Sequence, residues 1–167
     1  MIRVIKAPTP WMKEDVREVT IFLAGSIEMG AAVDWQSELT DSLVKTQETY
    51  VKNNVAWIRP ITILNPRRTD WNASWAQSIG NPQFNRQVTW ELDSLERADY
   101  VYMHFDPKTK SPITLLELGL CAPMKRDKLI INCPAGFWRK GNVEMMAAKY
   151  GCNVVSDFNQ LHYILTH

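Results

Sequence analysis

The fold of this chain is decided by the stretch YVYMHFDPKTKSPITLLELG, which covers residues 100–119. Its first residues, 100–103, form an apolar run typical of a buried strand. A polar loop follows at 105–110, and an apolar helical segment begins near Leu115. In an open α/β sheet, ligands bind outside the carboxyl ends of the strands. The acid one turn into this helix, Glu117, is therefore placed where a substrate can reach it.

Two roles are open for Glu117. Thr114 and Glu117 have the spacing of a capping box, in which the glutamate side chain bonds back to the N-cap amide. Ser111-Pro112 offers a competing helix start, with proline in the first helical position. The alternative is a chemical role, because an acid at an otherwise apolar helix start loses hydration free energy unless something uses it.

The composition is that of an ordinary globular protein. The chain has 167 residues, of which 46% are apolar and 22% charged, and we expect one domain over 1–167. A net charge of +1 does not favour duplex nucleic acid as a partner. No apolar run approaches the ~20 residues of a membrane span. The amino terminus lacks a signal-peptide core, and three widely spaced cysteines indicate neither disulfides nor zinc, so we expect a cytoplasmic protein.

Strands and helices alternate along the chain after an extended, proline-interrupted lead-in at 1–17. This alternation implies parallel strands joined by right-handed crossovers. We predict an α/β fold of the flavodoxin-like, doubly wound kind, with a five-stranded parallel sheet of order 2-1-3-4-5 and helices on both faces. The strands are expected at 19–24, 57–64, 100–104, 129–133 and 154–155, and the helices at 31–51, 84–97, 115–122, 142–150 and from Asp157 to about 165.

Polar segments follow the ends of the first two predicted strands. Gly25 and Ser26 end the first strand, where a glycine lets a ligand approach the backbone, although a plain turn explains them equally well. The segment NPRRTDW at 65–71 follows the second strand. Its arginines, Arg67 and Arg68, are suited to hold a phosphate or carboxylate in bidentate fashion. The alternative is a solvated pair on a loop.

Two helices bring further candidates towards the same edge. Glu91 lies one turn from Gln87 on the helix 84–97, at the border of its apolar stripe, and its ordinary role would be on the solvated face of the helix. Asn142 lies in the segment FWRKGNVE at 137–144, which follows the fourth strand and opens a helix. Helix amino termini favour anions and polar ligand groups. We therefore expect one site built from several loops.

Taken in order, these segments resemble the nucleoside 2-deoxyribosyltransferase-like superfamily, and its less studied second branch most closely. The resemblance covers roughly residues 19–150. The segments that carry it are FLAGSI at 22–27, NPRR at 65–68, QVTWE at 87–91, AD at 98–99, SPI at 111–113, LELG at 116–119 and FWRKGN at 137–142.

The resemblance implies roles for three positions. The nucleophile of the family falls on Glu117. The acid that helps to hold the sugar falls on Glu91, where most relatives have Asp. The transferases carry Asp at the position of Ser111, and the related deoxynucleotide N-hydrolases carry Ser there and accept a 5′-phosphate. The usual glycines between Ser111 and the nucleophile are replaced by ITL at 113–115.

The resulting hypothesis is an enzyme that cleaves the N-glycosidic bond of a (deoxy)nucleoside or nucleotide through a glycosyl ester on a glutamate and transfers the sugar to another base. The alternatives are an N-glycosidase that passes the sugar to water and a catalytically silent nucleotide-binding module. No metal or cofactor is expected, and the resemblance implies a homo-oligomer. Asp93 or Asn142 is a possible proton donor, and Trp71 or Trp138 can stack on the base. The catalytic candidates are Glu117 and Glu91, and the substrate-binding candidates are Gly25, Ser26, Arg67, Arg68, Asp70, Trp71, Asp106, Ser111 and Asn142.

Overall fold

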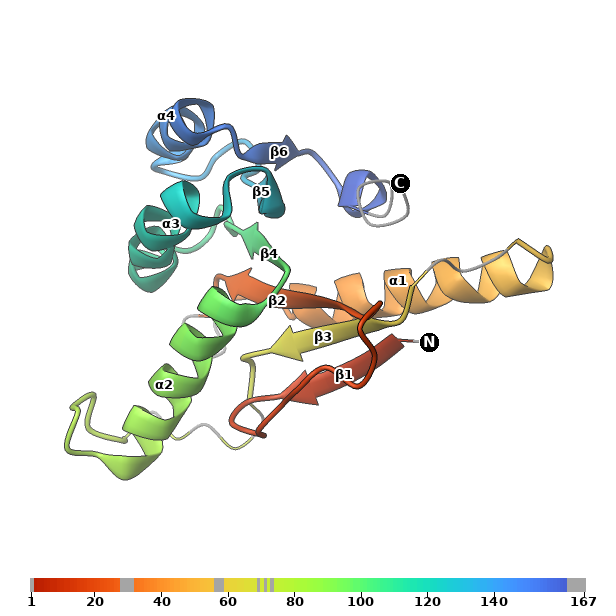
Figure 1. Ribbon diagram of the computed structural model, residues 1–167. Coiled ribbons are helices and arrows are strands. Elements are labelled where there is room, and N and C mark those ends of the chain that lie inside the picture. The colour runs from red at the N-terminus through yellow and green to blue at the C-terminus, as the bar shows by residue number, and fades with distance from the viewer. Residues whose placement is uncertain are drawn as a thin grey trace.

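A computed structural model of the chain describes residues 2–27, 32–55, 59–68, 70, 72 and 74–161. Six parallel strands form one sheet in the order β1-β3-β2-β4-β5-β6, and helices cover both of its faces (Figure 1). The fold is therefore α/β and flavodoxin-like in kind, as predicted. The strands are β1 (Ile2–Lys6), β2 (Val19–Gly25), β3 (Ile61–Asn65), β4 (Tyr100–His104), β5 (Leu129–Asn132) and β6 (Asn153–Val155).

The prediction of five strands is wrong, because the sheet has a sixth strand, β1, at its edge. This strand lies inside the predicted lead-in and pairs with β3, with Ile2 opposite Ile61. The five expected strands follow it in the order β3-β2-β4-β5-β6. An edge strand is recognised by the backbone hydrogen bonds that it makes with a distant segment, and the extended composition of the lead-in carries no information about that partner.

Two apolar clusters fill the space between the sheet and its helices. The first lies under α2 (Pro82–Arg97), α3 (Pro112–Lys125) and α4 (Lys140–Tyr150) and includes Trp90, Leu118 and Val143. The second lies under α1 (Trp35–Lys52) and includes Leu39 and Leu43. Every residue of β3 and β5 is buried, as expected for strands covered on both faces. The prediction of helices on both faces is confirmed.

The start of α3 corrects the capping-box interpretation. The helix begins at Pro112, and Ser111 occupies the N-cap position with a left-handed backbone at φ 46°. Thr114 therefore lies inside the first turn, and Glu117 lies a turn further on. The helix also continues past the predicted end at 122 to Lys125. Because the helix starts before Thr114, Thr114 and Glu117 do not form its cap.

The other helix boundaries differ from the predicted ones by a few residues. Asp34 caps α1, accepting a hydrogen bond of 3.2 Å from the Ser37 amide, and Asn81 caps α2 just before Pro82. Gly151 ends α4 with φ 71°. Asp157 accepts hydrogen bonds from two amides of the following turn. The predicted helix end near 165 and strand start at 57 lie outside the described residues.

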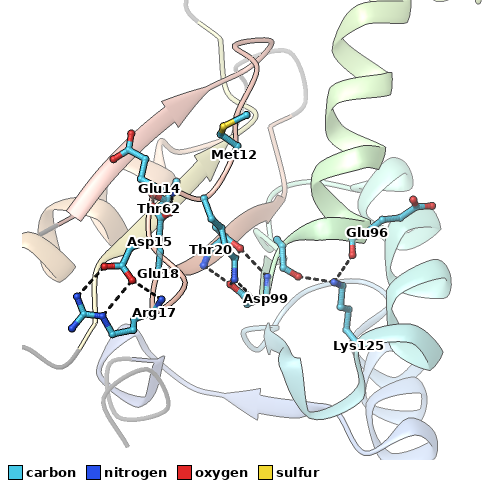
Figure 2. A network of polar contacts seen from close by, with 12 residues as sticks. Met12, Glu14, Asp15, Arg17, Glu18, Thr20, Thr62, Glu96, Asp99 and Lys125 are labelled. Carbon is cyan, nitrogen blue, oxygen red and sulfur yellow. Dashed lines mark hydrogen bonds and ion pairs between the residues drawn. The ribbon is translucent and has the colours of Figure 1, made fainter.

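A polar network connects the segments near the amino ends of the strands (Figure 2). The Asp99 carboxylate accepts hydrogen bonds of 2.8 Å from both the amide and the hydroxyl of Thr20, which joins the start of β4 to β2. Lys125 donates to the carbonyl oxygens of Glu96 and Ala98 at the end of α2. Glu18 accepts a hydrogen bond from Arg3 at 3.0 Å. The Ala98-Asp99 pair therefore stabilises the fold at the amino ends of the strands, opposite the candidate site.

Candidate functional site

Two carboxylates from neighbouring helices form the centre of the candidate site. Glu91 on α2 and Glu117 on α3 are both partly buried, and they come from the helices that cover one face of the sheet. Burial and the negative charge of Glu91 raise the pKa of Glu117 to about 8. Burial raises the pKa of Glu91 to about 7, although a hydrogen bond from Gln87 acts in the opposite direction. The two side chains therefore lie within electrostatic range of one another.

Such a pair titrates as a unit. Two carboxylates in an apolar setting resist simultaneous ionisation, because each charge disfavours the other and neither is fully hydrated. When both groups are ionised, this arrangement can stabilise a positive charge that develops beside the pair, and a carboxylate that has lost its proton can act as a nucleophile. Perturbed titration of this kind is typical of functional sites.

Three buried hydroxyl groups lie where β2 and β4 end. Ser26 follows β2, and Thr109 and Ser111 belong to the loop after β4. The Thr109 hydroxyl lies 2.9 Å from that of Ser26 and 2.7 Å from that of Ser111, and the Ser26 and Ser111 hydroxyls are hydrogen-bonded to each other. The structure thus brings Ser26 and Ser111 together, as the candidate site requires. Thr109 was missed by the sequence analysis, since nothing in the loop pattern distinguishes it.

Asp106 shapes the loop that carries these hydroxyls. It is 6% exposed, and its amide donates to the Ser26 hydroxyl at 2.9 Å. Its carboxylate accepts a hydrogen bond of 2.8 Å from the Lys108 amide, and its carbonyl oxygen accepts one from the Thr109 amide. These are the contacts of a tight turn that begins at an aspartate. Asp106 is therefore next to the hydroxyl cluster, with one carboxylate oxygen engaged by the turn.

Gly25 is required by close backbone packing. Its φ is 145°, and a Cβ atom there would lie 2.4 Å from the carbonyl oxygen of His104 and 2.9 Å from the ring of Trp35. The Trp35 indole also donates to the Ser26 carbonyl oxygen at 3.0 Å. The position therefore accepts no larger residue, and the turn after β2 is held rigidly against β4 and α1.

The two arginines of the β3 loop have separate partners. The Arg67 guanidinium donates to the carbonyl oxygens of Ala32 and Val33 at 3.0 and 3.1 Å, next to the start of α1. The Arg68 guanidinium donates two hydrogen bonds, of 2.8 and 2.6 Å, to the Asp70 carboxylate, and this bidentate ion pair lowers the pKa of Asp70. Their side chains are only 18% and 10% exposed, so the interpretation as a solvated pair is wrong. Trp71 lies outside the described residues.

The segment after β5 contacts the loop after β4, which carries Thr109 and Ser111, through a tryptophan. The Trp138 indole donates to the carbonyl oxygen of Lys110 at 3.0 Å, and the Arg139 guanidinium lies 4.2 Å from its ring centre. Asn142 is exposed on the first turn of α4. Trp138 is thus held against the loop that carries Ser111, while the residue stays 51% exposed. An exposed, fixed indole next to polar loops is suited to stack on a flat ligand.

Gln87 is a second residue whose part in the site was missed. It is buried on α2, and its amide nitrogen donates to the carbonyl oxygen of Pro66 at 3.0 Å and to Glu91 at 2.8 Å. It joins the loop after β3 to one of the two central carboxylates. The i, i+4 spacing of Gln87 and Glu91 was visible in the sequence and is the signal that points to this contact.

Asp93 lies apart from these groups. It lines a cleft of about 570 Å³ between α2 and the amino-terminal segment, together with Trp11 and Trp90. Neither Glu91 nor Glu117 lines that cleft. In the part of the chain that the structure describes, no cluster of three metal-ligating side chains is found, and no helix is long and apolar enough to cross a bilayer.

Comparison with known proteins agrees with the resemblance. A family profile described as nucleoside 2-deoxyribosyltransferase like matches residues 18–137, which include both carboxylates and the hydroxyl cluster. No curated protein matches the chain. The matched segment covers most of the sequence and runs from the start of β2 to the loop after β5. The chain therefore belongs to the nucleoside 2-deoxyribosyltransferase-like family.

Proposed function

We propose that the protein cleaves the N-glycosidic bond of deoxynucleosides or deoxynucleotides and transfers the sugar to another base, with Glu117 as the nucleophile. The observation that carries this proposal is the electrostatic coupling of Glu117 to Glu91 across two helices. Membership of the family supports a glycosyl-transferring enzyme that acts on small nucleosides. The position of Glu117, away from the helix cap, leaves its carboxylate without a role in starting α3.

The first step forms a glycosyl ester. As the bond from C1′ to the base nitrogen breaks, its electron pair goes to the base, which takes up a proton, and a carboxylate oxygen of Glu117 bonds to C1′ from the opposite face. In the second step, a nitrogen of the incoming base attacks C1′ and loses its proton, and Glu117 leaves as a carboxylate. Glu91 holds a hydroxyl of the sugar. C1′ becomes positively charged in both transition states, which favours the ionised form of the carboxyl pair.

The loops around the pair supply the substrate contacts. Trp138 is suited to stack on the base, because its ring is exposed and its indole is held by the Lys110 carbonyl oxygen. Ser26 and Ser111 carry neutral hydroxyls where β2 and β4 end, and a neutral group does not repel a 5′-phosphate. We therefore propose that 5′-monophosphates bind at least as well as nucleosides.

A two-substrate incubation tests the proposal. The protein is mixed with a deoxynucleoside, or its 5′-monophosphate, and a different free base, and the products are separated by chromatography. We expect the new nucleoside or nucleotide, and none with Glu117→Gln. A reaction of the parent that yields neither a new nucleoside nor free sugar would reject the proposal. Nucleotide binding by calorimetry without turnover would then identify a silent binding module.

The same incubation tests a second candidate, an N-glycosidase that passes the sugar to water. The hydroxyl of Ser111 inside the cluster favours this alternative, since the resemblance associates serine at that position with deoxynucleotide N-hydrolases. Free sugar phosphate with no new nucleotide, at saturating acceptor base, would identify the hydrolase. Both reactions share the glycosyl ester and differ only in the acceptor.

A further inference from the structure

Gln87 is an unusual residue for the buried face of α2. It is 3% exposed, and both partners of its amide nitrogen are oxygen acceptors, the Pro66 carbonyl and the Glu91 carboxylate. These partners fix the orientation of the amide, because a flipped amide would place oxygen against oxygen. Its own Oε1 is then buried with no hydrogen-bond partner among the described residues.

An unpaired buried oxygen is unfavourable, so packing does not explain this side chain. A buried polar atom without a partner destabilises the fold, whereas an apolar side chain of the same size has no such penalty. The favourable part of Gln87 is its amide nitrogen, which contacts two functional segments at once. It ties the Glu91 carboxylate to the loop that begins at Pro66 and carries Arg67 and Arg68.

We propose that Gln87 is the positioning residue of the carboxylate pair: its amide holds one oxygen of Glu91 and the loop after β3 in a fixed relation, so that the other oxygen of Glu91 is directed to the sugar beside Glu117. This inference rests on the proposed function. Gln87 itself does not touch the reacting atoms. It acts through Glu91, whose hydrogen-bonded oxygen is no longer free to rotate.

The hydrogen bond also acts on the charge of the pair. Donation from Gln87 favours the ionised form of Glu91 and opposes the effect of burial on its pKa. On α3, the ionisable group in electrostatic range of Glu91 is Glu117, which in turn acts on the thiol of Cys121. Loss of the Gln87 amide is therefore expected to raise the pKa of Glu91 and to loosen its orientation.

Gln87→Met tests the proposal, with Gln83→Met as the matched control. Methionine nearly matches glutamine in size and removes the donor, and Gln83 is exposed in the first turn of the same helix. We expect Gln87→Met to lower kcat/KM roughly 10- to 100-fold, the scale of a small misplacement of a reacting group. Gln87→Glu, which places a second charge beside Glu91, is expected to lower it further. Gln83→Met should match the parent.

Carboxyl NMR titration separates this inference from the proposed function. The apparent pKa of Glu91, followed by ¹³C labelling, is expected to be higher in Gln87→Met than in Gln83→Met, whether or not the parent is active. In the parent, the side-chain amide of Gln87 is expected to shift with the titration of Glu91, a measurement that needs no variant. An unchanged Glu91 titration, an amide that does not follow it, or unchanged kcat/KM in an active parent would each overturn the inference. An inactive parent would reject the proposed function alone.

Discussion

Glu91 on α2 and Glu117 on α3 form one titrating unit, in which burial and the charge of Glu91 raise the pKa of Glu117 to about 8. The unit exists only because two helices that are separate in the chain cover the same face of the sheet. Since the capping box is absent, Glu117 stabilises neither the start of α3 nor, when ionised, the fold. Its presence is explained by chemistry better than by structure.

Replacement of Glu117, the proposed nucleophile, is expected to affect activity and stability differently. Glu117→Gln should reduce turnover by at least about 1,000-fold, because a carboxamide is a far poorer nucleophile. The raised pKa of Glu117 means that the folded state binds a proton more tightly than the unfolded state, so the parent loses stability as pH rises from 4.5 to about 8. The variant should therefore match the parent in stability near pH 4.5 and exceed it at pH 9 by on the order of 5 kcal/mol, because each pKa unit corresponds to about 1.4 kcal/mol. Urea denaturation at both pH values measures the difference, and turnover near the parent rate would show that Glu117 is not the nucleophile.

The pH dependence of catalysis is expected to report the pair. As the proposed nucleophile, Glu117 must be ionised to attack, so kcat/KM should rise with pH through a midpoint near pH 8. Glu91→Gln removes the like charge and so lowers the pKa of Glu117. The rising part of the kcat/KM profile should then lie about one pH unit lower. The measurement is a profile of kcat/KM from pH 5 to 9. An unchanged midpoint of the profile in Glu91→Gln would contradict the electrostatic coupling of Glu117 to Glu91.

The hydroxyl cluster is expected to control the response to a 5′-phosphate. Ser111→Asp places a carboxylate beside Ser26 and Thr109, and aspartate tolerates the left-handed backbone of this position. Repulsion should weaken binding of a 5′-monophosphate by roughly tenfold more than binding of the nucleoside. Ser111→Asn is the neutral control and should not discriminate between the two. Calorimetry at low salt makes the comparison, and equal losses for both ligands would remove Ser111 from the phosphate end of the site.

The turn after β2 is expected to be sensitive to a single methyl group. Gly25→Ala would bring a Cβ atom to 2.4 Å from the His104 carbonyl oxygen at a φ of 145°, which we expect to destabilise the protein by roughly 3 kcal/mol or more. Gly141→Ala is the control, since nothing lies within 4 Å of its Cβ position in α4, and its effect should stay within about 1 kcal/mol. Chemical denaturation compares the two. Equal stability of both variants would mean that the turn moves to admit the methyl group.

The outer face of α3 is expected to join copies of the chain. Leu116 is 72% exposed there, next to exposed Ile113, Leu120 and Met124, and a second copy is the partner that the predicted homo-oligomer provides. Sedimentation at micromolar concentration should give a mass above the 19.3 kDa of one chain, and Leu116→Glu should lower it to that value. Val16→Glu, at a 95% exposed position far from α3 in the sequence, is the control. A parent that sediments only at the mass of one chain would contradict the prediction.

Much of the fold could be predicted because its signals are local. Apolar runs such as Ile21–Leu23 and 129–132 reveal buried strands, and the alternation of strands with helices implies a parallel sheet. The Ser111-Pro112 start of α3 was also visible in the sequence as one of two options. Such patterns are contained within one element, and propensity and periodicity act at that scale. The same reasoning placed Glu117, Ser26 and Ser111 near strand ends.

The tertiary structure alone decided how distant segments meet. In the folded protein β1 pairs with β3, and the hydroxyl of Thr109 contacts those of Ser26 and Ser111. The Arg67 guanidinium donates a hydrogen bond to Ala32, near the start of α1. Gln87 came to bridge Pro66 and Glu91 in the same way. These relations depend on backbone pairing and on burial, which change the partners and the pKa of a side chain without leaving a pattern in its own segment. Local patterns in the sequence predicted five of the six strands and the candidate residues Glu91 and Glu117, and the packing of the elements determined which residues share a hydrogen bond or act on one another's pKa.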